Sequence, residues 1–173
     1  MTRTARLLLL LFGSTLTAQS PRATAILPGF RSPIWMDTTG QVRTFAGPRD
    51  RVFAAVDSAM TSLGIPLDIR DAASGVVGTG RLKTQRRLAG VPMSRWLDCG
   101  VGARGSTADV YQVSLALLGM VRARQADSVE VRVAFAAGAQ DFSGPLGDPI
   151  SCSSTGALEE RVLNAVAARL KTS

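Results

Sequence analysis

The sequence predicts an α+β, two-layer domain in which a four-stranded antiparallel sheet carries two helices packed on one face. Two stretches place apolar residues at the three- and four-residue spacing of amphipathic helices. Between them, several segments alternate apolar and polar residues, as half-buried strands do. The short link over 122–127 favours antiparallel pairing of the last two of these segments. Aromatic residues make up only 5% of the chain, so we expect an aliphatic core.

The N-terminal residues have the layout of a secretory signal peptide. Arg3 and Arg6 precede an apolar run over 7–12, and small residues then lead to a cleavage position after Ala18. The run is shorter than the about 20 residues of a membrane-spanning helix, although an uncleaved anchor stays open as the alternative. No cysteine lies near residue 20, so we expect no lipid-modified N-terminus. The mature chain is expected to be periplasmic or secreted, peripheral to the membrane and without a transmembrane span.

The chain is expected to comprise a signal peptide over 1–18, an extended leader over 19–47 and a single α+β domain over 48–173. Residues 19–33 contain three prolines and show no periodicity, as extended linkers do. Residues 34–37 and 41–45 flank a Thr-Thr-Gly turn, which predicts a short hairpin at the end of the leader.

The domain opens with a predicted helix over 48–63, which lies between Pro48 at its first position and Gly64 just past its end. Its apolar stripe comprises Val52, Phe53, Val56, Met60 and Leu63. Alternation over 65–70 and 76–82 then predicts two strands joined by a turn.

The second half of the domain contains the clearest strands. A basic loop over 83–90 and one helical turn over 92–97, with Trp96 pointing inward, precede them. Residues 110–121 and 126–136 alternate, and the short link between them predicts an antiparallel hairpin.

A second helix closes the domain, with Ser154 or Thr155 as its cap. Acidic residues in its first turn and basic residues in its last complement the helix macrodipole. These residues are Glu159, Glu160, Arg169 and Lys171. The apolar stripe recurs every four residues through Leu158, Val162, Val166 and Leu170.

The two cysteines, Cys99 and Cys152, are predicted to form a disulfide, because an even count in an exported chain is typical of one. The bond would close a loop of about 54 residues and stabilise the fold by about 4 kcal/mol in the chain-entropy model. A redox or metal pair is the alternative. The chain has no histidine, and two thiols alone make a poor metal site.

The formal net charge of +7 favours anionic partners without choosing among them. The candidate contact surface is a local cluster of cations: Arg81, Lys83, Arg86, Arg87 and Arg95. In an exported protein such a surface suits anionic lipid headgroups, acidic polysaccharide or an acidic protein face. Nucleic acid is not expected, because no aromatic residues are interleaved for base stacking. A solvated arginine-rich surface is the alternative.

The residue patterns do not point to catalysis. The absence of histidine removes the commonest general base, the Ser-His and Cys-His nucleophile systems and most zinc sites. Paired aspartates could run hydrolysis, but the candidates sit mostly at turns, where Asp caps backbone N–H groups. They are Asp68, Asp71, Asp98, Asp109, Asp141 and Asp148. We expect no catalytic residues, no cofactor and no metal.

The stretch SLGIPLDIRDAASGVVGTG ends the first predicted helix and leads into the sheet. With the closing helix, this pattern resembles the helix-grip domains of the BamC-type (NlpB/DapX) outer-membrane assembly lipoproteins. The resemblance covers 52–80, and 158–170 fits the closing helix. It implies a non-catalytic envelope module that docks onto a larger membrane-associated assembly, and it carries over no functional residues. The chain lacks that family's lipid-anchor cysteine and has one such domain where the family carries two.

We therefore expect a non-catalytic binding or accessory module of the cell envelope that docks onto a membrane-associated protein assembly. A carrier of a small ligand or lipid is an alternative, because a helix that grips a curved sheet can leave an apolar cavity. A hydrolase that uses acidic residues is the second alternative.

Overall fold

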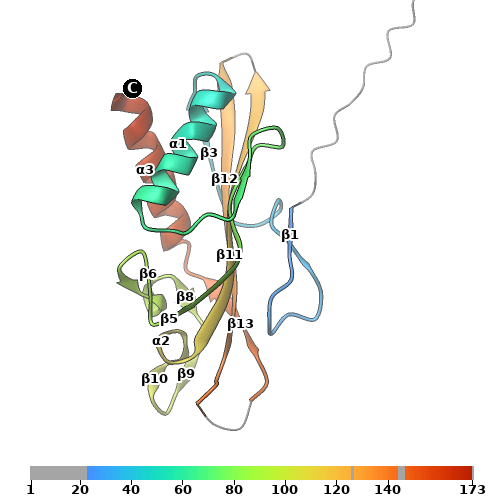
Figure 1. Ribbon diagram of the computed structural model, residues 1–173, viewed down its shortest axis with the longest axis vertical. Coiled ribbons are helices and arrows are strands. Elements are labelled where there is room, and N and C mark those ends of the chain that lie inside the picture. The colour runs from blue at the N-terminus through green and yellow to red at the C-terminus, as the bar shows by residue number, and fades with distance from the viewer. Residues whose placement is uncertain (1–22, 126, 144–146, 173) are drawn as a thin grey trace, which may run out of the picture.

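The computed structural model describes residues 23–125, 127–143 and 147–172. The predicted signal peptide over 1–18 lies outside these residues. Long antiparallel strands run along the length of the described part of the molecule, with two helices beside them (Figure 1).

Seven strands of the described residues form one antiparallel sheet. In spatial order they are β4 (Ile69–Asp71), β5 (Val76–Gln85), β11 (Gln112–Gln125), β12 (Ser128–Gln140), β13 (Ile150–Ser154) and β8 (Leu97–Asp98), while β3 (Gln41–Ala46) also pairs with β12. The predicted hairpin between the long strands is confirmed as β11 and β12. The predicted four-stranded, two-layer domain is wrong, because β3, β8 and β13 extend the sheet to seven strands.

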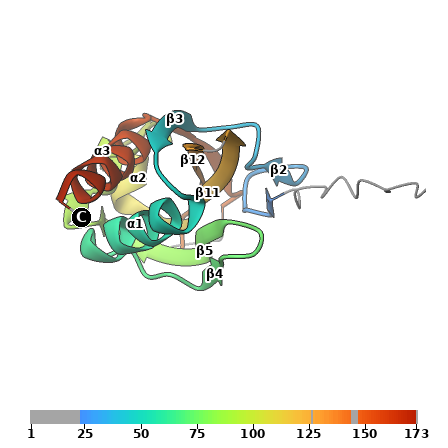
Figure 2. The same cartoon turned by 90° about the horizontal axis from the view of Figure 1, so that it is seen from above.

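The helices α1 (Arg49–Ser62) and α3 (Ala157–Thr172) lie side by side over one face of this sheet (Figure 2). Both predicted helices are confirmed. Their apolar stripes enter one core with the inward residues of β11 and β12. Gly119 of β11 lets α1 approach closely, because a Cβ there would lie 2.7 Å from Cγ1 of Val56.

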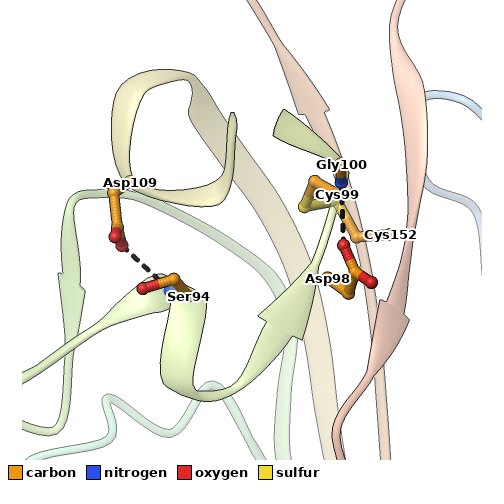
Figure 3. Close-up of a disulfide and its surroundings, with 6 residues drawn as sticks. All are labelled: Ser94, Asp98, Cys99, Gly100, Asp109 and Cys152. Carbon is orange, nitrogen blue, oxygen red and sulfur yellow. Dashed lines mark hydrogen bonds between the residues drawn. A yellow bond between two sulfur atoms is a disulfide. The ribbon is translucent and has the colours of Figure 1, made fainter. Parts of the chain in front are cut away.

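Between β5 and β11 the chain makes an excursion of short elements. They are β6 (Arg87–Leu88), β7 (Val91–Pro92), the 3₁₀ turn η1 (Met93–Arg95), β8, β9 (Val101–Gly102), β10 (Gly105–Ser106) and α2 (Thr107–Val110). Trp96 is buried, as predicted, and its Nε1 donates to the Leu88 carbonyl oxygen over 3.0 Å. The predicted disulfide between Cys99 and Cys152 is confirmed (Figure 3). It fastens the excursion to β13.

Residues 23–36, which we call the N-terminal layer, cover part of the opposite face of the sheet. Ala25, Leu27 and Met36 are buried there against an alanine-rich stripe of β11 and β12. Gly138 permits the close approach, because a Cβ at this position would lie 1.8 Å from the Pro28 carbonyl oxygen. The described chain therefore has three layers, with the sheet in the middle.

The predicted hairpin between residues 34–37 and 41–45 does not form. Instead β1 (Thr24–Ala25) pairs with β2 (Ile34–Trp35), and β3 pairs with β12. The apolar side chains of residues 34–37 and 41–45 bury more surface against the long strands than they would against each other in an isolated hairpin. This burial outweighs the local turn pattern.

Two strand boundaries differ from those predicted. The strand predicted over 65–70 is shorter in the structure: β4 begins at Ile69, just after the Asp68 N–H donates to the Gly78 carbonyl oxygen over 3.1 Å. Pro66 has no N–H to donate to a ladder. β5 runs on to Gln85, so the first residues of the predicted loop over 83–90 are strand. A β-bulge opposite Ala116 makes this possible by resetting which side chains of β5 face the core.

Candidate functional site

Three of the predicted contact residues lie together in the C-terminal half of β5 and just after it. Arg81 and Lys83 are exposed, while Leu82 and Thr84 are half-buried, so the strand presents its cations on one side. Arg86 follows in a turn with φ of 69° and is also exposed. We call Arg81, Lys83 and Arg86 the basic β5 segment.

The other two predicted contact residues, Arg87 and Arg95, lie outside this segment. The Arg87 guanidinium donates to the Gly90 carbonyl oxygen over 3.0 Å, within its own hairpin. The Arg95 carbonyl oxygen accepts from Thr155 Oγ1 over 2.9 Å, which places Arg95 near the start of α3. The five cations of the predicted surface are thus divided between the C-terminal end of β5, the β6–β7 hairpin and the 3₁₀ turn η1.

The basic β5 segment forms no ion pair with any residue in the described ranges. Several other arginines are paired. Arg70 contacts Asp57 at 2.8 Å, and Arg104 contacts Asp141 at 2.7 Å. The positive charge of this segment is therefore not neutralised by an ion pair within the described residues.

Most of the candidate aspartates are engaged with backbone N–H groups, either within their own turn or across the fold. Five accept a hydrogen bond from a backbone N–H: Asp68 from Gly80, Asp71 from Ser74, Asp98 from Gly100, Asp109 from Ser94 and Asp141 from Ser143. Figure 3 shows two of these bonds beside the disulfide. Hydrogen bonds from the Ser143 side chain and backbone, with the nearby Arg104 guanidinium, lower the pKa of Asp141. Asp71, Asp98 and Asp141 thus show the turn chemistry expected of aspartate, whereas Asp68 and Asp109 bond to the backbone of segments 12 and 15 positions away.

The described surface includes two hollows of moderate size. One, of about 250 Å³, lies between the start of the N-terminal layer and the β4–β5 hairpin, and is lined by Ala23, Thr24, Ile69, Asp71, Ser74, Val76 and Leu118. The other, of about 170 Å³, lies beside the β9–β10 hairpin. Both are smaller than the roughly 300–1,000 Å³ of typical small-molecule sites.

Within the described ranges, no cluster of three or more cysteine and acidic side chains is arranged to hold a metal ion. The described helices include none with the length and hydropathy needed to cross a bilayer. A scan against protein-family models gives no match, and a search of the curated proteins gives none either.

Glu159 is a buried carboxyl that the sequence pattern placed in the first turn of a helix without indicating its burial. It is 2% exposed, and its Oε1 accepts from Ser154 Oγ over 2.7 Å. Its Oε2 is buried and has no hydrogen-bond partner among the described residues. Desolvation by burial raises the pKa of Glu159, and the Ser154 hydrogen bond offsets this in part.

Because the folded-state pKa of Glu159 is raised, its contribution to stability falls as pH rises from the ordinary carboxyl pKa through the raised value. The Glu159→Gln variant is therefore expected to be more stable than the wild type at pH 7, by about 1 kcal/mol. The gain should vanish near pH 4, where the carboxyl is protonated. Thermal unfolding at both pH values measures it, with Glu160→Gln, at the exposed neighbouring position, as the control. Equal midpoints for the two variants at pH 7 would contradict the prediction.

Proposed function

We propose that this protein is a non-catalytic, exported module of the cell envelope that docks onto a membrane-associated protein assembly through the basic β5 segment. The observation that carries the proposal is the exposure of Arg81, Lys83 and Arg86 without a described ion-pair partner. Charged patches of this kind steer encounter with partners of opposite charge and fix the orientation in which they bind.

The disulfide supports the exported location. Disulfides persist in the periplasm and outside the cell, whereas cytosolic reductants keep most thiols reduced. Cys99 and Cys152 are both largely buried and join two elements of the sheet region, as structural disulfides do. The N-terminal charge and apolar pattern of the sequence points to the same location.

The two alternative functions have less support. A lipid carrier needs an apolar cavity of substantial volume, and the hollows of about 250 and 170 Å³ described above are each smaller than a typical small-molecule site. A hydrolase needs two carboxylates that face one cleft, and five of the candidate aspartates accept hydrogen bonds from five separate backbone N–H groups.

Charge reversal tests the proposed contact surface. The Arg81→Glu, Lys83→Glu double variant is expected to reduce by about tenfold the fraction of exported protein that sediments with envelope membranes, because it replaces attraction by repulsion. The matched control is Arg31→Glu, Lys171→Glu, which makes the same change in net charge at exposed positions elsewhere. Equal sedimentation of the two double variants would contradict the proposal.

A second comparison identifies the kind of partner. Membranes stripped of exposed protein by trypsin are expected to lose the interaction, while vesicles of phosphatidylglycerol are expected to bind weakly. Undiminished binding to stripped membranes would favour a lipid surface over a protein assembly.

A further inference from the structure

The C-terminal half of β5, residues 81–85, is an open edge of the sheet. On its outer side, β4 pairs only with Val76–Gly78 of β5. Beyond that, the Asp68 side chain accepts from the Gly80 N–H over 3.0 Å. Over residues 81–85, no other described strand pairs with the outer side of β5, and no described backbone group bonds to it. Such an edge is a template for another extended chain.

The register determines which backbone groups this edge offers. The Val121 N–H donates to the Gly75 carbonyl oxygen over 2.8 Å, so Val121 directs its backbone groups toward β5. Alternate residues along β11 do the same, and these include Leu115 and Val113, which lie opposite Leu82 and Thr84. Leu82 and Thr84 therefore turn their N–H and C=O groups inward.

By the same alternation, Lys83 and Gln85 direct their N–H and C=O groups outward. The side chains of Arg81 and Lys83 stand on one side of this edge, while Leu82 is half-buried on the other. The edge thus combines free backbone donors and acceptors with uncompensated positive charge.

We propose that this edge takes up an extended acidic peptide segment of the partner as an added strand. The inference rests on the proposed function, because it specifies the partner of the same basic surface. The charge selects the occupant: a second copy of this chain would bring the same cations against Lys83 and be repelled. An extended segment with carboxylates on alternate residues places them on one side, opposite Arg81 and Lys83. Its intervening side chains would lie on the side of Leu82.

The probe is the capped peptide Ser-Glu-Val-Glu-Val-Glu-Ser, and its control is Ser-Val-Glu-Glu-Glu-Val-Ser, which has the same composition and charge. We expect the alternating peptide to bind the full-length exported protein at least about tenfold more tightly, since only it matches the pleat of a strand. Amide hydrogen exchange of Lys83 and Gln85 is expected to slow when it binds. Equal affinity of the two peptides, or unchanged exchange at both amides, would overturn the inference.

Backbone methylation separates strand addition from simple charge pairing. One analogue carries N-methyl groups on both valines, and another carries them on the glutamates. Only one set of peptide N–H groups faces the edge in an added strand, so one analogue should lose binding while the other retains it. Loss by both analogues, or by neither, would overturn strand addition.

Two variants of the protein make the same distinction. Lys83→Gln removes the charge but keeps the outward N–H, whereas Lys83→Pro removes both. Proline is tolerated on edge strands where its nitrogen faces outward, and circular dichroism checks that both variants fold. We expect Lys83→Pro to bind the alternating peptide at least about fivefold more weakly than Lys83→Gln, in keeping with one lost hydrogen bond. Equal affinities would contradict the inference.

The membrane assay separates this inference from the proposed function. If the protein still sediments with membranes but binds none of the peptides, the docking function stands and the added strand is rejected.

Discussion

Removal of the Cys99–Cys152 disulfide is expected to lower the free energy of unfolding by about 4 kcal/mol, the largest single effect that the structure predicts. The bond joins residues that are 53 positions apart, so the unfolded chain gains the conformational freedom of a long loop when it is cut. The change is made with Cys99→Ser together with Cys152→Ser and measured by urea denaturation. A loss of this size is a large fraction of the stability of an ordinary domain.

The control for this prediction is reduction. Dithiothreitol should lower the urea midpoint of the wild type to near that of the double serine variant and leave the variant unchanged. A double variant as stable as the oxidised wild type would show that the excursion between β5 and β11 is held by its packing alone. Its anchor would then be Trp96, which is 5% exposed and donates to Leu88.

The second large effect is expected at Gly138. A Cβ at this position would lie 1.8 Å from the Pro28 carbonyl oxygen. This oxygen belongs to the backbone, which cannot rotate out of the way as the end of a flexible side chain can. The Gly138→Ala variant must therefore push the N-terminal layer away from β12. We expect a loss of about 2–3 kcal/mol and faster amide exchange of Met36, whose N–H donates to the Ala23 carbonyl oxygen.

Gly102→Ala is the matched control, because the nearest atom to an added Cβ there is Thr107 Oγ1 at 3.9 Å. It should unfold like the wild type and protect Met36 equally well. If Gly138→Ala behaved in the same way, the N-terminal layer would not be docked at Pro28 as described.

The elements that rest on local patterns were predictable from the sequence. The helix α1 and the β11–β12 hairpin have strong periodicity over many residues, and both were confirmed. The disulfide followed from the cysteine count and the expected compartment. In each case the deciding information lies within the segment itself or in the composition.

The size of the sheet was not predictable in this way. β8 and β13 are short and pair with each other across more than fifty positions, and β3 pairs with β12 across more than eighty. β3 and β13 form because β12 offers them an unpaired edge, and β8 in turn pairs with β13. No local sequence pattern indicates such pairing. The N-terminal layer was missed for the same reason, since its proline-rich sequence has no periodicity and its burial depends on Gly138.

The candidate site was predictable in part. The cluster of cations could be read along the chain, but the bulge in β5 and the Gly90 contact of Arg87 divide its members. The burial of Glu159 gave no sequence signal, because a first-turn glutamate is common on exposed helices. The open edge of β5 could be recognised only once the register of all neighbouring strands was known.

The placement of the two tryptophans makes the molecule its own optical reporter. Trp96 is enclosed beneath the Arg161 guanidinium, 5.6 Å from its ring centroid, whereas Trp35 is 46% exposed on β2. Indole fluorescence shifts to longer wavelength when the ring meets water, so the two residues emit differently in the native protein. In a Trp35→Phe variant, the fluorescence of Trp96 would report unfolding of the core alone. In a Trp96→Phe variant, the fluorescence of Trp35 would report release of the N-terminal layer, without any added dye.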